Sequence, residues 1–336
     1  MMTPRIKQIH PLAGVEGGRV SILGEALSGE VGLPAPRFES LESRPLIASP
    51  TRIVVPIPED AVSGFLAVAW PETVVQGPYF EVAEKLAEEL HPVANPVVDR
   101  QGAILTTFSG SRGQAAPGGV SVFRIPSGRS AEPFLSDLVN PTGLALDPEG
   151  ALYISCRNDG TIRKVTGPGQ VETVIEGLGI PTGIVFDAAG RLYVGDRSGT
   201  VHIVEPQGAT RPLARLPASV AAYHLALGPD GMLYVTAPTL SNDDPIYRVS
   251  ASGEVTSVVE HLARPQGLAF DREGVLYVVA IARGERGVFR IGTDRQPTLV
   301  VAGENLIGLT FDDQGRMVIA SANAIYRLAW PLERAA

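Results

Sequence analysis

The sequence predicts an all-β protein in two parts, a small N-terminal β-sandwich followed by a six-bladed β-propeller. The 336 residues include 37 glycines and 28 prolines, spread along the whole chain, which indicates many turns and few long helices. A unit made of an apolar strand, a D-x-x-G turn and a second apolar strand recurs six times, at the period of a four-stranded propeller blade. Because 44% of the residues are hydrophobic, the chain can bury a large core and is not disordered.

The N-terminal part, residues 1–79, has the pattern of a small β-sandwich. Apolar and polar residues alternate between turn signals in four segments, which are 4–11, 17–24, 51–58 and 64–70. Such alternation is typical of strands that bury one face and leave the other in water. We therefore expect about 80 residues of paired strands before the repeats begin.

The six repeats occupy residues 80–336 and are marked by their turns. The turns begin at Asp99, Asp147, Asp187, Gly228, Asp271 and Asp312, with intervals of 48, 40, 41, 43 and 41 residues. An Asp at the first position accepts hydrogen bonds from the backbone ahead of it, and the Gly at the fourth position adopts positive φ. A strand follows each turn and starts with an apolar pair, as in Leu152-Tyr153. Each repeat thus predicts one blade.

The last blade needs a strand from elsewhere in the chain. The sixth repeat reaches Leu328 with only eight residues left, too few for a turn and a fourth strand. Leu90 lies nine residues before its turn, the same offset at which Leu178 and Leu262 end fourth strands. We therefore expect residues 80–90 to donate the outer strand of the last blade, although their composition alone also fits an amphipathic helix.

Composition excludes several classes of function. The formal net charge is −8, with 28 Lys and Arg against 36 Asp and Glu, which disfavours nucleic acid and anionic membrane surfaces as partners. The single cysteine, Cys156, cannot form an intrachain disulfide. No window reaches the ~18 apolar residues of a membrane span, and the N-terminus lacks the apolar run of a signal peptide. We expect a soluble, cytoplasmic protein.

Both parts resemble known families. Residues 1–79 resemble the IPT/TIG domain, an immunoglobulin-like module, through P-x-I-x-x-I-x-P, then G-G-x-V-x-I-x-G, then a strand ending in V-x-V/I-P. Residues 80–336 resemble the six-bladed NHL-repeat and SMP-30/gluconolactonase/LRE-like propellers through P-x-G-[LI]-A-[LF]-D-x-x-G-x-L-Y-V. The nearest copies of this motif begin at Pro141 and Pro265. Such motifs specify fold better than function.

The resemblance also implies where a metal would lie. Gluconolactonase-type members bind one divalent cation at the centre of the ring, through Glu, Asn and Asp side chains at the start of the inner strands. The matching positions here are Ala94, Thr142, Thr182, Tyr223, Gln266 and Ile307. None of these is a carboxylate, so we expect no metal and no cofactor. Thr142, Thr182, Tyr223 and Gln266, with the adjacent His224, are instead expected to hydrogen-bond a polar ligand.

Arginines in the loops between second and third strands suggest a ligand of opposite charge. Arg157 and Arg197 occupy equivalent places in successive repeats, and Arg283 lies in the corresponding loop of a later repeat. Convergent guanidinium groups suit a carboxylate, a phosphate or an acidic peptide. The alternative is that these arginines form ion pairs with acids of the same loops, such as Asp159 and Asp196.

Two functions remain open. The first is a binding or scaffold propeller that recognises a small anionic ligand or a protein partner at its mouth. The second is a hydrolase or lyase with a rearranged central site, in which His224 acts as general base and Tyr223 polarises the substrate. A buried His224 that only packs between blades would argue against the second function.

Overall fold

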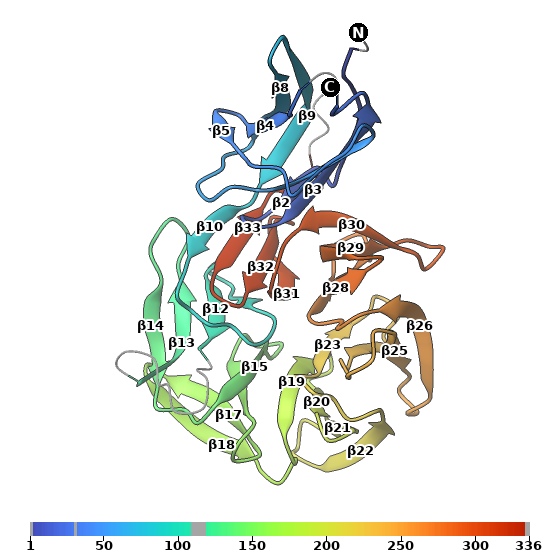
Figure 1. The fold of residues 1–336 in the computed structure, drawn as a ribbon. Coiled ribbons are helices and arrows are strands. Elements are labelled where there is room, and N and C mark those ends of the chain that lie inside the picture. Colours follow the sequence, from blue (N-terminus) through green and yellow to red (C-terminus); the bar gives the residue numbers. More distant parts are fainter. Residues whose placement is uncertain (1–2, 30–31, 109–118, 333–336) are drawn as a thin grey trace.

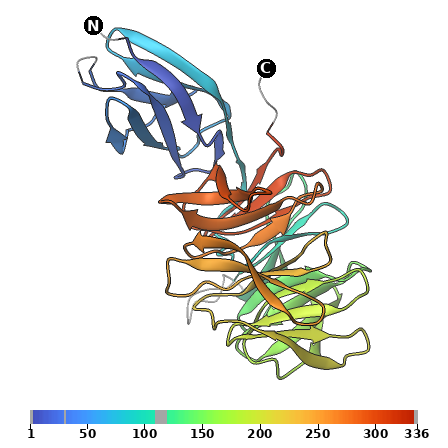
Figure 2. The ribbon, with the colours of Figure 1, turned by 90° about the vertical axis from the view of Figure 1, so that its right-hand side faces the viewer.

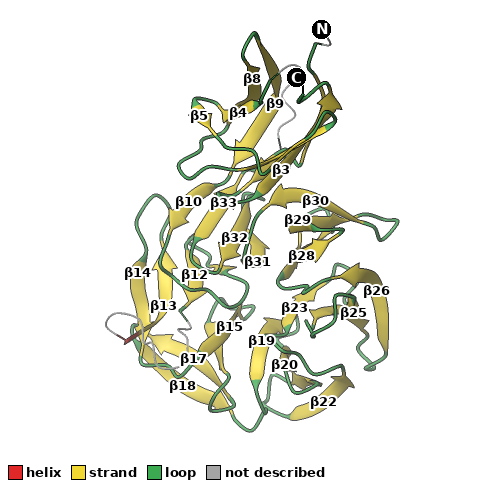
Figure 3. Ribbon diagram, viewed as in Figure 1, coloured by secondary structure: helices red, strands yellow, loops and turns green. Residues whose placement is uncertain are grey.

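The computed structural model describes residues 3–29, 32–108 and 119–332. Across these ranges the regular structure is made of strands, without an α-helix (Figure 3), so the prediction of an all-β chain is confirmed. The described residues contain no helix with the length and hydropathy needed to cross a membrane.

Two sheets form the N-terminal module, which we define as β1 to β9 (Figures 1 and 2). The first sheet has the order β1 (Arg5–His10), β3 (Arg19–Glu25), β7 (Arg52–Pro56), β6 (Ile47–Ala48). The second has the order β2 (Ala13–Gly14), β9 (Thr73–Val82), β8 (Gly64–Trp70), β4 (Ala35–Phe38), β5 (Leu41–Glu42). Alternating residues of both sheets, such as Ile22, Ile53 and Leu66, are fully buried in one shared core.

Six blades of four strands each form a ring (Figure 1), and we number them 1 to 6. Blade 1 has β11 (Val97–Val98), β12 (Ile104–Thr107), β13 (Val120–Ile125) and β14 (Glu132–Ser136). Blade 2 has β15 (Pro141–Leu146), β16 (Leu152–Cys156), β17 (Thr161–Gly167) and β18 (Gln170–Ile175). Blade 3 has β19 (Pro181–Phe186), β20 (Leu192–Asp196), β21 (Thr200–Val204) and β22 (Thr210–Arg215).

The second half of the ring repeats this arrangement. Blade 4 has β23 (His224–Leu227), β24 (Leu233–Thr236), β25 (Asp244–Val249) and β26 (Val255–Leu262). Blade 5 has β27 (Leu268–Phe270), β28 (Leu276–Ala282), β29 (Glu285–Ile291) and β30 (Pro297–Ala302). Blade 6 has β31 (Leu306–Phe311), β32 (Met317–Ser321), β33 (Ile325–Leu328) and β10 (Glu84–Ala87).

The D-x-x-G turns form by the local chemistry that their residues suggest. Asp99 Oδ1 accepts hydrogen bonds from the backbone N–H groups of Gln101 (2.9 Å) and Ala103 (2.8 Å), and Gly102 has φ +76°. The same pair of bonds to an Asp carboxylate recurs at Asp147, Asp187 and Asp312. These bonds complete each turn locally and set the start of the second strand.

Blade 6 takes its outer strand from the chain that precedes blade 1. β10 pairs antiparallel with β33, with Glu84 opposite Arg327. Asn95, which lies just before blade 1, makes a second connection to the last blades. Its Nδ2 donates to the carbonyl oxygen of Leu268 in blade 5 (3.1 Å), and Leu309 N of blade 6 donates to its Oδ1 (3.2 Å). Gly267 leaves room for this amide, since a Cβ there would lie 2.1 Å from Asn95 Oδ1. Asn95 therefore ties blade 1 to blades 5 and 6.

The N-terminal module is joined to the ring through β2. Gly14 pairs in parallel with Ala302, so the second sheet of the module and blade 5 form one nine-stranded sheet. Val15 N donates to the Ala302 carbonyl oxygen at 2.9 Å, and Val15 is buried in the core of blades 5 and 6. The carboxylate of Glu16 accepts hydrogen bonds from Tyr326 Oη (2.9 Å) and Lys85 Nζ (3.2 Å). Part of the module is thus built into the core of the propeller.

Candidate functional site

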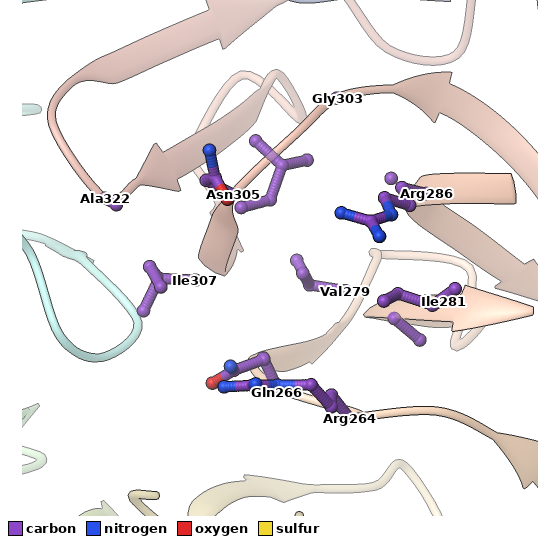
Figure 4. Close-up of a pocket in the computed structure, with 12 residues that line it drawn as sticks. Arg264, Gln266, Val279, Ile281, Arg286, Gly303, Asn305, Ile307 and Ala322 are labelled. Atoms are coloured by element: carbon purple, nitrogen blue, oxygen red, sulfur yellow. The ribbon is translucent and has the colours of Figure 1, made fainter. Parts of the chain in front are cut away.

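The inner strands begin, and the second strands end, on one face of the ring, which we call the mouth. In blade 2, for example, Pro141 at the start of β15 pairs with Cys156 at the end of β16. A pocket of about 310 Å³ opens at the mouth between blades 5 and 6 (Figure 4). This mouth pocket lies at the level where the family resemblance places ligands, because Gln266 and Ile307 line it.

The mouth pocket has a cationic lining with an apolar wall. Its charged lining side chains are those of Arg264 and Arg286, and the amides of Gln266 and Asn305 add hydrogen-bond donors and acceptors (Figure 4). Val279, Ile281 and Ile307 supply the apolar wall. The described lining residues include no Asp, Glu, His or Cys. Such a surface attracts anions and offers them bidentate hydrogen bonds.

A carboxylate at the edge of the mouth pocket already holds one of these arginines. Arg286 Nη1 donates to Glu304 Oε2 at 3.0 Å, while Arg19 Nε of the N-terminal module forms an ion pair with Glu304 Oε1 at 3.0 Å. Half of the Arg286 side chain remains exposed to solvent. A ligand anion at this guanidinium therefore competes with Glu304.

Three of the expected ligand residues, Thr142, Thr182 and Tyr223, are buried, and their hydroxyl groups are engaged. Thr142 Oγ1 donates to the Asn140 carbonyl oxygen (3.2 Å). Thr182 Oγ1 donates to the Gly195 carbonyl oxygen (3.2 Å) and accepts from Tyr223 N (2.9 Å). Tyr223 Oη donates to the Pro217 carbonyl oxygen (2.5 Å), and burial raises its pKa. The Thr182 hydroxyl thus joins β19 to β20 and blade 3 to blade 4, while those of Thr142 and Tyr223 bond within their own segments.

His224 is buried at the start of blade 4, next to Gln266. Burial lowers the pKa of its imidazole to about 4, although the neighbouring Gln266 side chain acts in the opposite direction. The ring is therefore neutral at pH 7 and a weak base. Its Nε2 has no hydrogen-bond partner among the described residues.

The residues at the centre of the ring do not fit a divalent cation. Ala94 and Ile307 have no ligating atom, and the hydroxyl groups of Thr142, Thr182 and Tyr223 bond to backbone groups. In the ranges that the structure describes, no three His, Cys, Asp or Glu side chains gather as a ligand set. A hard cation such as Ca²⁺ requires several oxygen ligands, most of them from carboxylates.

Arg157 and Arg197 lie close together on blades 2 and 3, half-buried. Burial and the charge of Arg197 lower the pKa of Arg157. Arg157 Nη2 donates to Asn140 Oδ1 (3.4 Å), and Arg197 Nη2 donates to the Val220 carbonyl oxygen (3.3 Å). No carboxylate of the described residues forms an ion pair with either arginine.

The loop acids considered as partners for these arginines bond to other groups. Asp159 pairs with Arg163 at 3.0 Å. Asp196 accepts hydrogen bonds from Ile180 N (3.0 Å) and Ser198 N (2.9 Å). These acids stabilise their own loops, and the two guanidinium groups remain available to an external anion.

Arg283 does not join the other predicted arginines. Its side chain is exposed, and its Nη2 donates to Gln296 Oε1 at 3.1 Å. It lies in a separate groove that Glu260 and His261 of blade 4 also line.

Sequence reasoning missed Arg264 and Asn305 of the mouth pocket. Each lies two residues before an inner-strand position that was considered, Gln266 or Ile307. Both have left-handed backbone conformations, with φ +49° for Arg264 and +54° for Asn305, as does the equivalent Asn140 at +50°. This offset recurs in blades 2, 5 and 6, and two of its three residues are asparagines, the non-glycine type that tolerates this conformation best.

Solved structures with a similar fold identify the architecture of this chain. No family model and no curated protein sequence matches the chain. A structural-genomics protein of unknown function from Bacteroides thetaiotaomicron has a TM-score of 0.60 at 13% identity, over 98% of each chain. An auxiliary nutrient binding protein from the same organism has a TM-score of 0.54 at 12% identity, over 97% of each chain. The fold is a β-propeller.

The propeller part also matches an enzyme. A gluconolactonase from Xanthomonas campestris has a TM-score of 0.60 at 16% identity, over 73% of this chain and 88% of that chain. The prediction of a propeller is thereby confirmed. Because these identities are low, the likenesses concern the fold and leave the chemistry to the residues of this chain.

Proposed function

We propose that this chain is a binding propeller that takes a small anionic molecule in the mouth pocket between blades 5 and 6. The observation that carries this proposal is the lining of the mouth pocket: two arginines and two amides, with no acid among the described lining residues. This cationic lining belongs to a chain with a net charge of −8, so it does not follow from overall composition. A nutrient-binding protein among the structural neighbours is consistent with a binding role.

The chemistry of the mouth pocket defines the class of ligand. Arg264 and Arg286 suit a carboxylate or phosphate, and each charge-assisted hydrogen bond contributes about 1.5–3 kcal/mol where water is excluded. Val279, Ile281 and Ile307 favour a ligand with a carbon skeleton. A pocket of about 310 Å³ fits a molecule of metabolite size, such as an organic acid or a sugar acid.

The two parts of the chain have distinct roles in this proposal. The propeller is of the NHL and SMP-30/gluconolactonase type, with the metal-ligand positions replaced by neutral residues. The N-terminal module is of the IPT/TIG, immunoglobulin-like type, and it serves as a scaffold that supports blades 5 and 6 from outside. The contact between Gly14 and Ala302 supports this assignment, since Ala302 directly precedes the segment 303–307 of the mouth pocket.

A hydrolase or lyase is the second candidate, because His224 Nε2 has no partner in the described structure and lies beside Gln266 of the mouth pocket. The burial of His224, which is not among the residues that line the mouth pocket, argues against this candidate. Tyr223 supports this candidate less, because its hydroxyl group is bonded to Pro217. Lactone hydrolysis by the purified chain that is lost in His224→Gln would favour the enzyme.

Calorimetric titration of the full chain with phosphate, citrate and gluconate tests the binding proposal, with neutral glucose as the control ligand. We expect at least one anion to bind, glucose not to bind, and Arg264→Ala with Arg286→Ala to weaken binding at least ~tenfold. Arg272→Ala is the matched control, because Arg272 is an exposed arginine on a D-x-x-G turn at the other end of β27. Absence of anion binding, or equal affinity in the double variant, would overturn the proposal.

A further inference from the structure

Four exposed apolar side chains border the mouth on blades 2 to 4, away from the mouth pocket. Their exposed fractions are 54% for Val139, 39% for Ile180, 46% for Val220 and 90% for Leu240. Three of these residues precede the inner strands of their blades, and Leu240 follows β24. All four therefore lie on the mouth face. Blades 2 and 3 occupy the side of the ring farthest from the N-terminal module (Figure 1).

Hydrogen bonds join these apolar residues to the loops of the two arginines. Arg157 N donates to the carbonyl oxygen of Asn140, the neighbour of Val139, at 3.3 Å. Arg197 N donates to the Ile180 carbonyl oxygen at 3.1 Å, and its guanidinium reaches the Val220 carbonyl oxygen. Val220 N donates to the Pro238 carbonyl oxygen at 3.0 Å, which joins the loop of Val220 to the loop that carries Leu240. The six residues thus lie on connected loops of the mouth face, and we call this surface the arginine crescent: Val139, Arg157, Ile180, Arg197, Val220 and Leu240.

The arginine crescent combines unneutralised charge with exposed apolar area. Arg157 and Arg197 are half-buried, and burial together with the charge of Arg197 lowers the pKa of Arg157. The acids of their own loops bond to other groups. A carboxylate from another molecule would therefore complement this surface.

We propose that the arginine crescent docks an acidic segment of a partner protein, in which Asp or Glu residues alternate with aliphatic residues. A peptide fits better than a compact metabolite because the apolar residues come from four separate loops on three blades. An extended chain projects successive side chains to opposite sides, so carboxylates can reach the arginines while aliphatic groups cover Val139, Ile180, Val220 and Leu240. This surface is separate from the mouth pocket of blades 5 and 6 and goes beyond the small-molecule function proposed for it.

Selection of a random phage-displayed peptide library on the immobilised full chain tests this proposal. We expect the enriched peptides to contain Asp or Glu next to Leu, Ile or Val. Synthetic copies of these peptides should bind Arg157→Ala with Arg197→Ala at least ~tenfold more weakly than the unchanged chain, a difference of about 1.4 kcal/mol. Leu240→Ser should also weaken peptide binding. Because the Leu240 side chain is exposed, the melting temperature of this variant should equal that of the unchanged chain.

Arg264→Ala with Arg286→Ala is the matched control, and it should keep full peptide affinity because both residues line the mouth pocket. This control also separates the two proposals, since either site can fail while the other binds. The docking proposal is wrong if no peptide is enriched or if the enriched peptides lack Asp and Glu. It is also wrong if these peptides bind Arg157→Ala with Arg197→Ala as tightly as the unchanged chain. Direct binding of decanoate that is lost in Arg157→Ala with Arg197→Ala, when no peptide is enriched, would assign the arginine crescent to a small amphiphile and would also overturn the proposal.

Discussion

Glu304 and Arg286 form an ion pair of 3.0 Å at the edge of the mouth pocket, and the second carboxylate oxygen of Glu304 forms an ion pair with Arg19, also at 3.0 Å. One carboxylate therefore holds both a lining residue of the mouth pocket and the N-terminal module. Gly303 N also donates to the Arg286 carbonyl oxygen at 3.2 Å, which fixes the backbone on both sides of this contact. The N-terminal module is thus connected through Glu304 to a residue that lines the mouth pocket.

Glu304→Gln should strengthen anion binding in the mouth pocket. The variant keeps the size of the side chain and removes the negative charge that competes for Arg286. Since exposed ion pairs contribute up to about 1 kcal/mol, we expect roughly two- to fivefold tighter binding of citrate in calorimetric titration. Glu273→Gln, an exposed acid on the turn before β28, is the control. Weaker or unchanged citrate binding in Glu304→Gln would contradict this prediction.

Burial of His224 should make the stability of the chain depend on pH in mild acid. The pKa of the folded imidazole is about 4, below the ordinary value of 6.5. As pH falls from 6.5 toward 4, the unfolded chain takes up a proton at this position and the folded chain does not. Above pH 6.5 the imidazole is neutral in both states, so its burial carries no protonation cost. By pH 4 the free energy of unfolding falls by up to about 3 kcal/mol.

Urea unfolding at about pH 7.5 and about pH 4.5 measures this effect. His224→Gln should lose much less stability between the two pH values than the unchanged chain. His261→Gln, which alters an exposed imidazole, should behave like the unchanged chain. Equal pH dependence in His224→Gln and the unchanged chain would show that the buried ring is already protonated or that its burial is relieved in solution.

Asn95→Ala should destabilise the closed ring. The substitution removes the bonds to the Leu268 carbonyl oxygen and the Leu309 N–H and leaves both backbone groups without this partner. At about 1–3 kcal/mol for each unsatisfied buried group, we expect a loss of roughly 2–4 kcal/mol in the free energy of unfolding. Asn158→Ala, an exposed asparagine in the β16–β17 loop, is the control. Similar urea midpoints for the two variants would refute a role of Asn95 in closure.

Glu16→Ala should weaken the attachment of the N-terminal module to blade 6. Tyr326 is buried, and its hydroxyl group loses its acceptor in this variant, while Lys85 loses one of its two carboxylate partners. We expect a lower melting temperature, equivalent to about 1–3 kcal/mol, when it is followed by scanning calorimetry. Glu59→Ala removes an exposed acid from the same module and should leave the melting temperature unchanged. An unchanged melting temperature in Glu16→Ala would mean that this contact contributes no net stability.

The sequence by itself determined the all-β class and the positions of the blades. These features depend on short-range chemistry: Asp99 bonds to its own turn, Gly102 adopts positive φ, and strand residues alternate between core and solvent. The spacing of Leu90 from its turn also pointed to residues 80–90 as the outer strand that β33 needs, and β10 lies within that segment. Each of these signals is either local to one repeat or found by comparing the same position in several repeats.

Only the tertiary structure decided which polar residues remain free for a ligand. Thr142, Thr182 and Tyr223 occupy promising positions, but their hydroxyl groups bond to backbone carbonyl oxygens, and the fold brings Tyr223 N of blade 4 to Thr182 Oγ1 of blade 3. Arg264 and Asn305 become pocket residues because two blades, each placed by its own turns, meet there.

The attachment of the N-terminal module was likewise beyond the sequence pattern. Glu16 and Tyr326 are 310 positions apart, and β2, the strand that joins the module to blade 5, has only two residues. Local propensity carries no information about such contacts, since they depend on the packing of surfaces that exist only after both parts have folded.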